Sequence, residues 1–170
     1  MKAAITLILL FCSVGLISCS ETKAVNEVAK PVVSPSSHQV QTLLPAINRE
    51  RTKRGLPKLS ENVRLARAAY LHAKEQMAEN ALNHSSLNGD SVSDRVSAQG
   101  YSWSFVAENL AAGRETAQET LVDWINSPGH NRNLFTKQAT EFGAAYVSRP
   151  RKSQNDLGHF WVLVLAAPLE

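Results

Sequence analysis

Three histidines and one glutamate are the residues of this 170-residue chain whose types and surroundings suggest chemistry. His84 lies in a polar segment, His130 follows a Ser-Pro-Gly turn, and His159 opens a long apolar run. Glu108 lies within the mostly apolar segment 105–112, where a carboxylate is costly to bury unless a partner compensates its charge. We therefore hypothesise that these four side chains converge on one polar cleft.

Imidazole and carboxylate groups suggest more than one kind of chemistry. They are ligands that suit zinc or a similar divalent ion, and His84, Glu108 and His159 are the candidate metal ligands. The carboxylate could instead orient an imidazole as a general base. Each histidine could also be a structural residue, with Glu108 in a buried salt bridge. No pair has helical spacing, so the sequence leaves these interpretations open.

The motifs of several large enzyme classes are absent from the sequence. It has no HExxH, GxSxG, GxxxxGK[ST] or GxGxxG, which argues against zincin proteases, α/β-hydrolases and nucleotide enzymes. Ser85 and Ser127 are the nearest nucleophile candidates, but nothing local marks a nucleophile elbow, which favours cap or turn roles.

The basic residues do not indicate nucleic-acid binding. The net charge is only +3, and the two basic clusters, at 49–54 and 149–152, contain no interleaved aromatic residues. We interpret both clusters as solvated faces.

The first 37 residues are predicted to export and anchor the chain. Residues 1–18 resemble a signal peptide whose apolar part, 3–17, is too short to span a bilayer. The sequence Leu-Ile-Ser-Cys at 16–19 resembles a bacterial lipobox, which would make Cys19 the lipidated mature N-terminus; an ordinary secretory signal is the alternative. Residues 19–37 are predicted to be a flexible tether. Because Cys12 lies in the signal, no disulfide is possible in the mature chain.

Residues 38–170 are predicted to form a single α+β domain with a small, mainly antiparallel sheet. The apolar run 159–166 predicts a strand buried on both faces, with helices on each side of the sheet, and 140–147 predicts its neighbour. The second helix carries His72 as a packing or surface residue, and Asp94 with Arg95 is interpreted as a cap-and-salt-bridge device that shapes the loop. Capping residues and periodicity predict four helices, which begin at Ser37, at Ser60 with Glu61 in its first turn, at Ser91, and at the Thr116–Glu119 capping box. In the first helix, residues 51–54 are predicted to face mainly solvent. After the fourth helix, residues 131–135 are predicted to form a short turn.

An ordered set of short motifs resembles one protein family. The motifs are NHS at 83–85, GD at 89–90, SDR at 93–95, GYSW at 100–103, AENLAAG at 107–113, WINSPGH at 124–130, TEFG at 140–143 and GHFWV at 158–162. In this order they resemble a bacterial CAP domain, also called an SCP domain, over about residues 40–167. The superfamily includes cysteine-rich secretory proteins, venom antigen five and plant pathogenesis-related proteins.

The resemblance implies a three-layer α-β-α sandwich with a central cleft. In the eukaryotic family this cleft carries two histidines and two glutamates that can hold a divalent metal. Carried over by motif, the positions fall on His84, Glu108 and His159. The second glutamate is missing, since this chain has Asn126-Ser127 there, and the SPGH motif of the bacterial branch suggests His130 as a contributor.

The expected function is that of a binding module. We expect a monomeric, extracytoplasmic CAP protein that is lipid-anchored to a bacterial membrane and whose cleft holds a small ligand, lipid, glycan or peptide, with or without a divalent metal such as zinc. The alternative is a metal- or histidine-assisted hydrolase acting on cell-envelope substrates, with Glu108 orienting a histidine base. A scaffold role in the envelope is a third interpretation.

Overall fold

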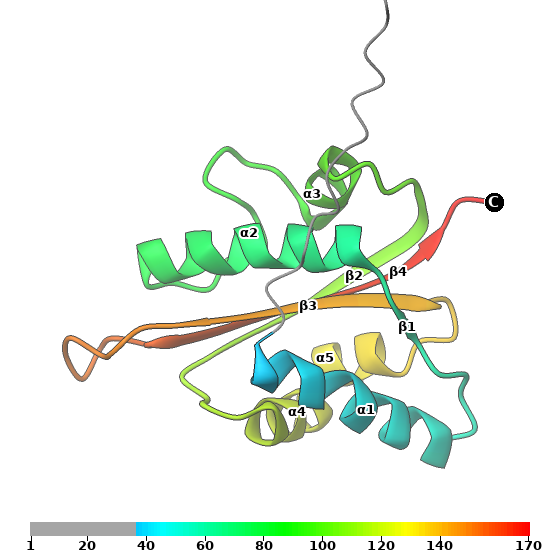
Figure 1. Cartoon of the computed structure of the whole chain (residues 1–170), viewed down its shortest axis with the longest axis horizontal. Helices are drawn as coiled ribbons and strands as arrows, with labels where there is room; N and C mark the ends of the chain where they lie inside the picture. The colour runs from blue at the N-terminus through cyan, green and yellow to red at the C-terminus, as the bar shows by residue number, and fades with distance from the viewer. Residues whose placement is uncertain (1–36) are drawn as a thin grey trace, which may run out of the picture. The chain divides into compact units, whose positions relative to one another are not determined.

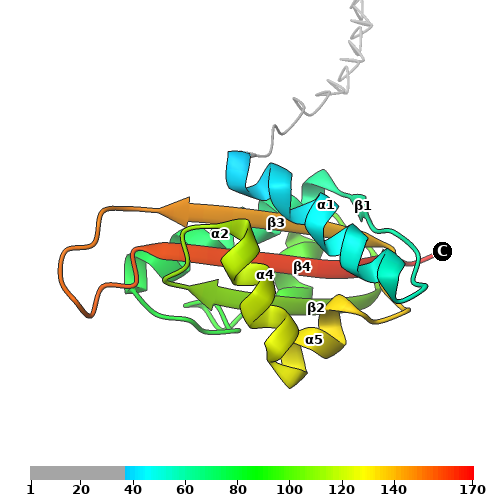
Figure 2. The same cartoon turned by 90° about the horizontal axis from the view of Figure 1, so that it is seen from below.

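The structure, a computed structural model, describes residues 37–170 as three layers in which a sheet lies between two layers of helices (Figure 1). The predicted signal, Cys19 and tether therefore lie outside the described residues. Helices α2 and α3 cover one face of the sheet, and α1, α4 and α5 cover the other (Figures 1 and 2). The elements are α1 (His38–Lys53), β1 (Ser60–Glu61), α2 (Val63–Glu79), α3 (Val92–Ala98), β2 (Trp103–Ala112), α4 (Ala117–Asn126), α5 (Pro128–Leu134), β3 (Glu141–Ser148) and β4 (His159–Pro168).

Strand β4 is central to a sheet of order β1-β3-β4-β2. It pairs antiparallel with β2 on one side and with β3 on the other, while the short β1 pairs parallel with β3. Every residue from 160 to 167 is buried, which confirms the predicted burial of this strand on both faces. The α+β class and the three-layer sandwich are likewise confirmed.

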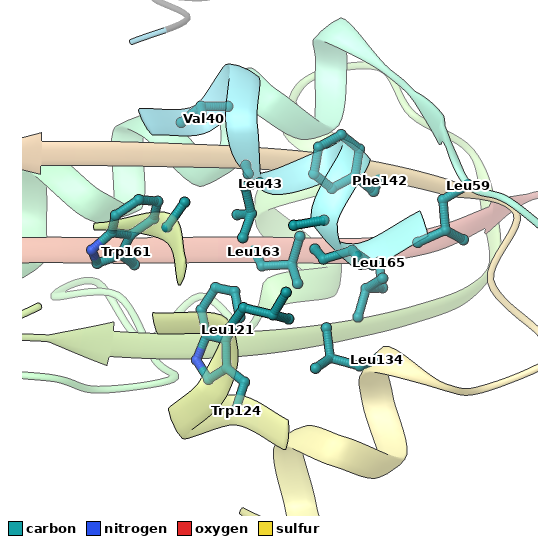
Figure 3. Packing of buried hydrophobic residues seen from close by; sticks show 14 of the residues in the cluster. Val40, Leu43, Leu59, Leu121, Trp124, Leu134, Phe142, Trp161, Leu163 and Leu165 are labelled. Atoms are coloured by element: carbon teal, nitrogen blue, oxygen red, sulfur yellow. The ribbon is translucent and has the colours of Figure 1, made fainter. Parts of the chain in front are cut away.

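Alternate residues of β4 pack into two separate apolar cores. Trp161, Leu163 and Leu165 pack with α1, α4 and α5 (Figure 3). Val162 and Val164 pack on the other face with residues of α2 and α3. Successive strand residues point to opposite faces, so the position of a residue along a strand decides which helical layer it meets.

Helix α2 packs very close to β3. Leu65, Ala66 and Ala69 are fully buried against the sheet. At Gly143 in β3, an added Cβ would lie 2.1 Å from the backbone nitrogen of Ala66 and 2.2 Å from the carbonyl carbon of Leu65. The glycine is therefore what allows the helix backbone to contact the strand.

The predicted caps at Ser37, Ser91 and Thr116 are confirmed, but the predicted start of the second helix is wrong. Ser60 and Glu61 form strand β1, because the Ser60 amide donates to the Thr140 carbonyl beside β3. Asn62 caps α2 instead, and its side chain accepts a hydrogen bond from Arg64 N at 2.9 Å.

The turn expected after Ser127 is a helix, α5, which begins with Pro128 at its first position. Proline fits there because the first-turn amide that it lacks has no partner within a helix. The sequence correctly predicted that α4 ends at this point, but not that a new helix begins.

The prediction that 51–54 mainly face solvent is wrong for Arg51, which is fully buried. Its guanidinium donates to the Pro57 carbonyl at 2.9 Å and to the Leu134 and Thr136 carbonyls at 2.7 and 3.0 Å. The side chain thus joins the end of α1 to the segment that follows α5. No helix within residues 37–170 is long and apolar enough to cross a membrane.

Candidate functional site

Glu108 is the buried centre of the candidate site. It lies on β2, and its side chain is 2% exposed. One carboxylate oxygen, Oε1, lies 2.9 Å from Nδ1 of His84, and the other, Oε2, accepts a hydrogen bond from Nη2 of Arg95 at 2.6 Å. Both oxygens of a carboxylate that is costly to bury are therefore paired.

The segment that carries His84, residues 80–91, is held in place by side chains of α2. The Gln76 side chain accepts from the Asn83 amide at 2.6 Å, and the Glu75 carboxylate accepts from the Leu87 amide at 3.0 Å. His72 is buried between the Glu75 carboxylate and the Asn83 carbonyl. This agrees with its predicted packing role, and its contact with the Asn83 carbonyl joins the loop to α2.

Arg95 joins this loop to Glu108 from α3. Its Nη1 donates to the carbonyls of His84 and Asp90 at 3.1 and 2.9 Å, and its side chain is 8% exposed. The predicted loop-shaping role of Arg95 fits these contacts. Asp94, however, forms the capping box with Ser91, and the salt bridge of Arg95 is made to Glu108. The alternative of a buried salt bridge at Glu108 is therefore confirmed, although the sequence did not identify Arg95 as the partner.

His130 reaches the same strand, β2, from helix α5. Asn109 donates to the His130 carbonyl at 3.1 Å, and Asn133 donates to the Glu108 carbonyl at 3.1 Å. These asparagines fix α5 to the strand, and only the polar Asn109 within an apolar strand could have indicated this from the sequence. The charge of His84 is the second cause, after burial, of the lowered pKa of His130.

The two histidines have pKa values shifted in opposite directions. The hydrogen bond with Glu108 raises the pKa of His84, although partial desolvation and the Arg95 charge act against it. Burial lowers the pKa of His130, and the nearby His84 lowers it further. The site therefore favours the protonated form of His84 and the neutral form of His130 more than water does for a free histidine.

His159 does not join the other three residues. Its Nδ1 lies 2.7 Å from the Tyr146 hydroxyl, and its Nε2 lies 3.6 Å from the exposed Glu115 carboxylate. Tyr146 also packs on Trp161, on the face covered by α1 and α4. Glu108, in contrast, lies between residues of β2 that face α2 and α3. The predicted convergence is wrong for His159, because its ring contacts Tyr146 and Glu115 and not Glu108.

The predicted metal set of His84, Glu108 and His159 is consequently not assembled. Within residues 37–170, no group of three or more His, Cys, Asp or Glu side chains is arranged to hold a metal. The donors that remain are the imidazoles of His84 and His130. Because Nδ1 of His84 faces a paired carboxylate, it donates its proton there and leaves the lone pair on Nε2 for a ligand.

Two hollows near the helices are distinct from this histidine pair. One, of about 570 Å³, runs along α1 between Pro45 and Lys58 and includes none of the four candidate residues. The other, of about 230 Å³, lies between α2 and α3 and is lined by Arg95, His72 and Glu75 among others. The candidate site is therefore identified by the chemistry of its side chains and not by the volume of a hollow, since the larger hollow contains none of the candidate histidines or Glu108.

Comparison with known proteins gives a consistent result for the fold. A profile of the cysteine-rich secretory protein family, CAP, matches residues 44–165. The Bacillus subtilis protein YkwD is 32% identical over 100 residues, which is 59% of this chain but only 39% of YkwD. This chain therefore spans well under half the length of that relative.

Two solved structures also resemble it. An outer surface protein from Borrelia burgdorferi has a TM-score of 0.68 at 21% identity, covering 77% of this chain and 93% of the Borrelia protein. An extracellular protein containing an SCP domain from Bacillus anthracis has a TM-score of 0.65 at 25% identity, covering 74% of this chain and 39% of the other. The first of these likenesses concerns the fold alone.

Proposed function

Because the chain belongs to the cysteine-rich secretory protein (CAP) family, we propose that it is an extracytoplasmic, lipid-anchored binding module whose ligand is held by His84 and His130. The extracellular SCP-domain protein of Bacillus anthracis supports the placement outside the cytoplasm. The lipobox-like sequence at 16–19 supports lipidation of Cys19, and the acyl chains would then attach the protein to a membrane.

The observation that carries the proposal is the pairing of Glu108 with His84. A carboxylate that accepts the Nδ1 proton of an imidazole fixes its tautomer and increases the basicity of Nε2, as is usual around zinc. The donor set of two imidazoles suits zinc or another imidazole-binding divalent ion, with further positions left to water or to a peptide, glycan or lipid group. When bound, such an ion would supply Lewis acidity to the group that it holds.

Binding is favoured over the alternative of a hydrolase. Ser85 and Ser127, the candidate nucleophiles, both belong to turns: the Ser85 amide donates to the Asn83 side chain, and Ser127 separates α4 from α5. Glu108 has both oxygens engaged, so its role is to orient His84 rather than to move a proton to a substrate.

Calorimetric titration of the purified protein with Zn²⁺ tests the proposal. His84→Ala and His130→Ala should each weaken zinc binding by about 10-fold or more, because each removes one of two donors. His159→Ala is the matched control, since it removes an imidazole whose partners are Tyr146 and Glu115 and should leave the affinity unchanged. Wild-type affinity in both His84 and His130 variants would contradict the proposal.

A further inference from the structure

The hollow of about 570 Å³ along α1 carries positive charge and lies apart from the histidine site. Its lining residues are Pro45, Asn48, Arg49, Thr52, Lys53 and Lys58. Three of them are exposed cations, and no acidic side chain of residues 37–170 lines the hollow. Within the same residues, Arg49 and Lys58 have no ion-pair partner, whereas Lys53 lies 2.7 Å from Glu50. At least two uncompensated cations therefore face solvent in one hollow.

The segment that carries Lys58 is fixed beside α1. The Asn48 side chain donates to the Leu59 carbonyl at 3.0 Å and accepts from the Leu59 amide at 2.8 Å. The buried Arg51 donates to the Pro57 carbonyl at 2.9 Å. These contacts hold Lys58 on the same hollow as the cations of the helix, so the positive surface is built by the fold.

We propose that this hollow docks the domain on an anionic bilayer surface. Long lysine and arginine side chains suit such a surface, because their methylene stems cover apolar area while their charges reach polar groups. Each lysine or arginine held near an anionic leaflet increases partition onto it by about fivefold. The basic cluster at 49–54, together with Lys58, thereby acquires a partner that needs neither a metal nor the histidine site.

The place of the hollow in the chain favours a membrane over a soluble polyanion. Helix α1 is the first element of the described domain (Figures 1 and 2). If Cys19 is lipidated, residues 20–37 can separate the start of α1 from the bilayer by at most about 60 Å. An anchored chain would therefore keep the hollow at a high effective concentration of lipid headgroups. This step rests on the proposed function, whereas the charge of the hollow does not.

Co-sedimentation of the purified full-length protein with two kinds of vesicle tests the inference. One kind is pure phosphatidylcholine, and the other contains equal parts of phosphatidylcholine and phosphatidylglycerol. The ratio of the two partition coefficients cancels the apolar contribution of the N-terminal segment, which is the same in every variant. The wild type should prefer the anionic vesicles, and Arg49→Gln combined with Lys58→Gln should lower the ratio by about 25-fold.

Arg64→Gln combined with Lys74→Gln is the matched control. It also removes one exposed arginine and one exposed lysine, but from α2, which covers the other face of the sheet (Figure 1). Its ratio should stay close to that of the wild type. Glu50→Gln should raise the ratio, because Glu50 pairs with Lys53 and Arg54 at 2.7 Å, and a misfolded protein would not produce that gain.

Three results would overturn the inference: a wild type without preference for the anionic vesicles, an unchanged ratio in either α1 variant, or an equal loss in the control. Binding of soluble dextran sulfate through Arg49 and Lys58, without a preference for anionic vesicles, would replace the membrane with a soluble polyanion as the partner. The measurement uses neither zinc nor the lipid on Cys19. Its failure would therefore be distinguishable from failure of the proposed function.

Discussion

At the scale of single residues, the site shows how a buried carboxylate acquires a function. Glu108 lies in an apolar strand and needs compensation, which Arg95 supplies as a charge and His84 as a ring N–H donor. The same pairing that makes burial tolerable also fixes the ring that a ligand would meet. Removing either partner of a buried ion pair commonly costs about 3 kcal/mol or more, so stability and ligand binding depend on the same contact.

The opposite pKa shifts give a prediction for pH. A titration followed by NMR should show the pKa of His84 above 6.5 and that of His130 below it. Because its folded-state pKa is raised, His84 stabilises the fold at pH values below its unfolded pKa, and this contribution disappears as pH rises through the folded pKa. His130 acts in the opposite sense: its contribution is complete above its unfolded pKa and is lost as pH falls through the lowered folded pKa.

Glu108→Gln should lower the pKa of His84, since the hydrogen bond with Glu108 is the main cause of its elevation. Glu115→Gln is the control, because Glu115 lies near His159 rather than near His84. A His84 titration that is the same in Glu108→Gln and wild-type protein would show that another group raises its pKa.

At the scale of elements, the position of the His84 loop depends on how closely α2 packs on β3. Gln76 and Glu75 on α2 hold the loop backbone, so any displacement of the helix is transmitted to His84. The close approach is possible because Gly143 has no side chain beneath the helix. The packing of α2 on β3 thus helps to position His84.

Gly143→Ala should therefore destabilise the protein strongly. A Cβ placed 2.1 Å from the backbone of α2 forces the helix or the strand to move, and overpacking of this kind costs about 1–3 kcal/mol or more. Gly129→Ala is the matched control, since an added Cβ there meets no atom within 4 Å. Chemical denaturation should show a large loss in the first variant and little change in the second; equal stability would mean that α2 can retreat without cost.

At the scale of the whole molecule, the proposed anchor determines where the domain works. Two or three acyl chains on Cys19 would hold the protein on a membrane far more firmly than one chain. No helix within residues 37–170 is long and apolar enough to cross a membrane. The lipid would then confine the histidine site to the envelope, where peptides, glycans and lipids are the available ligands.

Cys19→Ser tests the anchor. In the bacterial host the wild type should fractionate with membranes and carry the mass of its acyl chains. The serine variant should lack that mass and leave the membrane fraction, because serine offers no thiol for acylation. Ala24→Ser, a substitution in the predicted tether, should fractionate as the wild type. A wild type whose Cys19 carries no lipid would leave an ordinary secretory signal as the explanation.

The sequence by itself determined the features that depend on neighbours along the chain. The caps at Ser37, Ser91 and Thr116 were predictable because a capping side chain bonds to an amide two or three residues away. The burial of β4 was predictable from its uninterrupted apolar run, and the need of Glu108 for a partner was predictable from its apolar surroundings.

Only the tertiary structure decided which of the distant residues meet. The face on which His159 lies depends on the register of β4 against β2, since a shift by one residue would move every side chain to the opposite face. Arg95 and Arg51 could each have faced solvent, and their partners, Glu108 and the carbonyls after α5, are brought to them by packing. The side chains that share a site are selected by the relative placement of helices and strands, which no local pattern along the chain records.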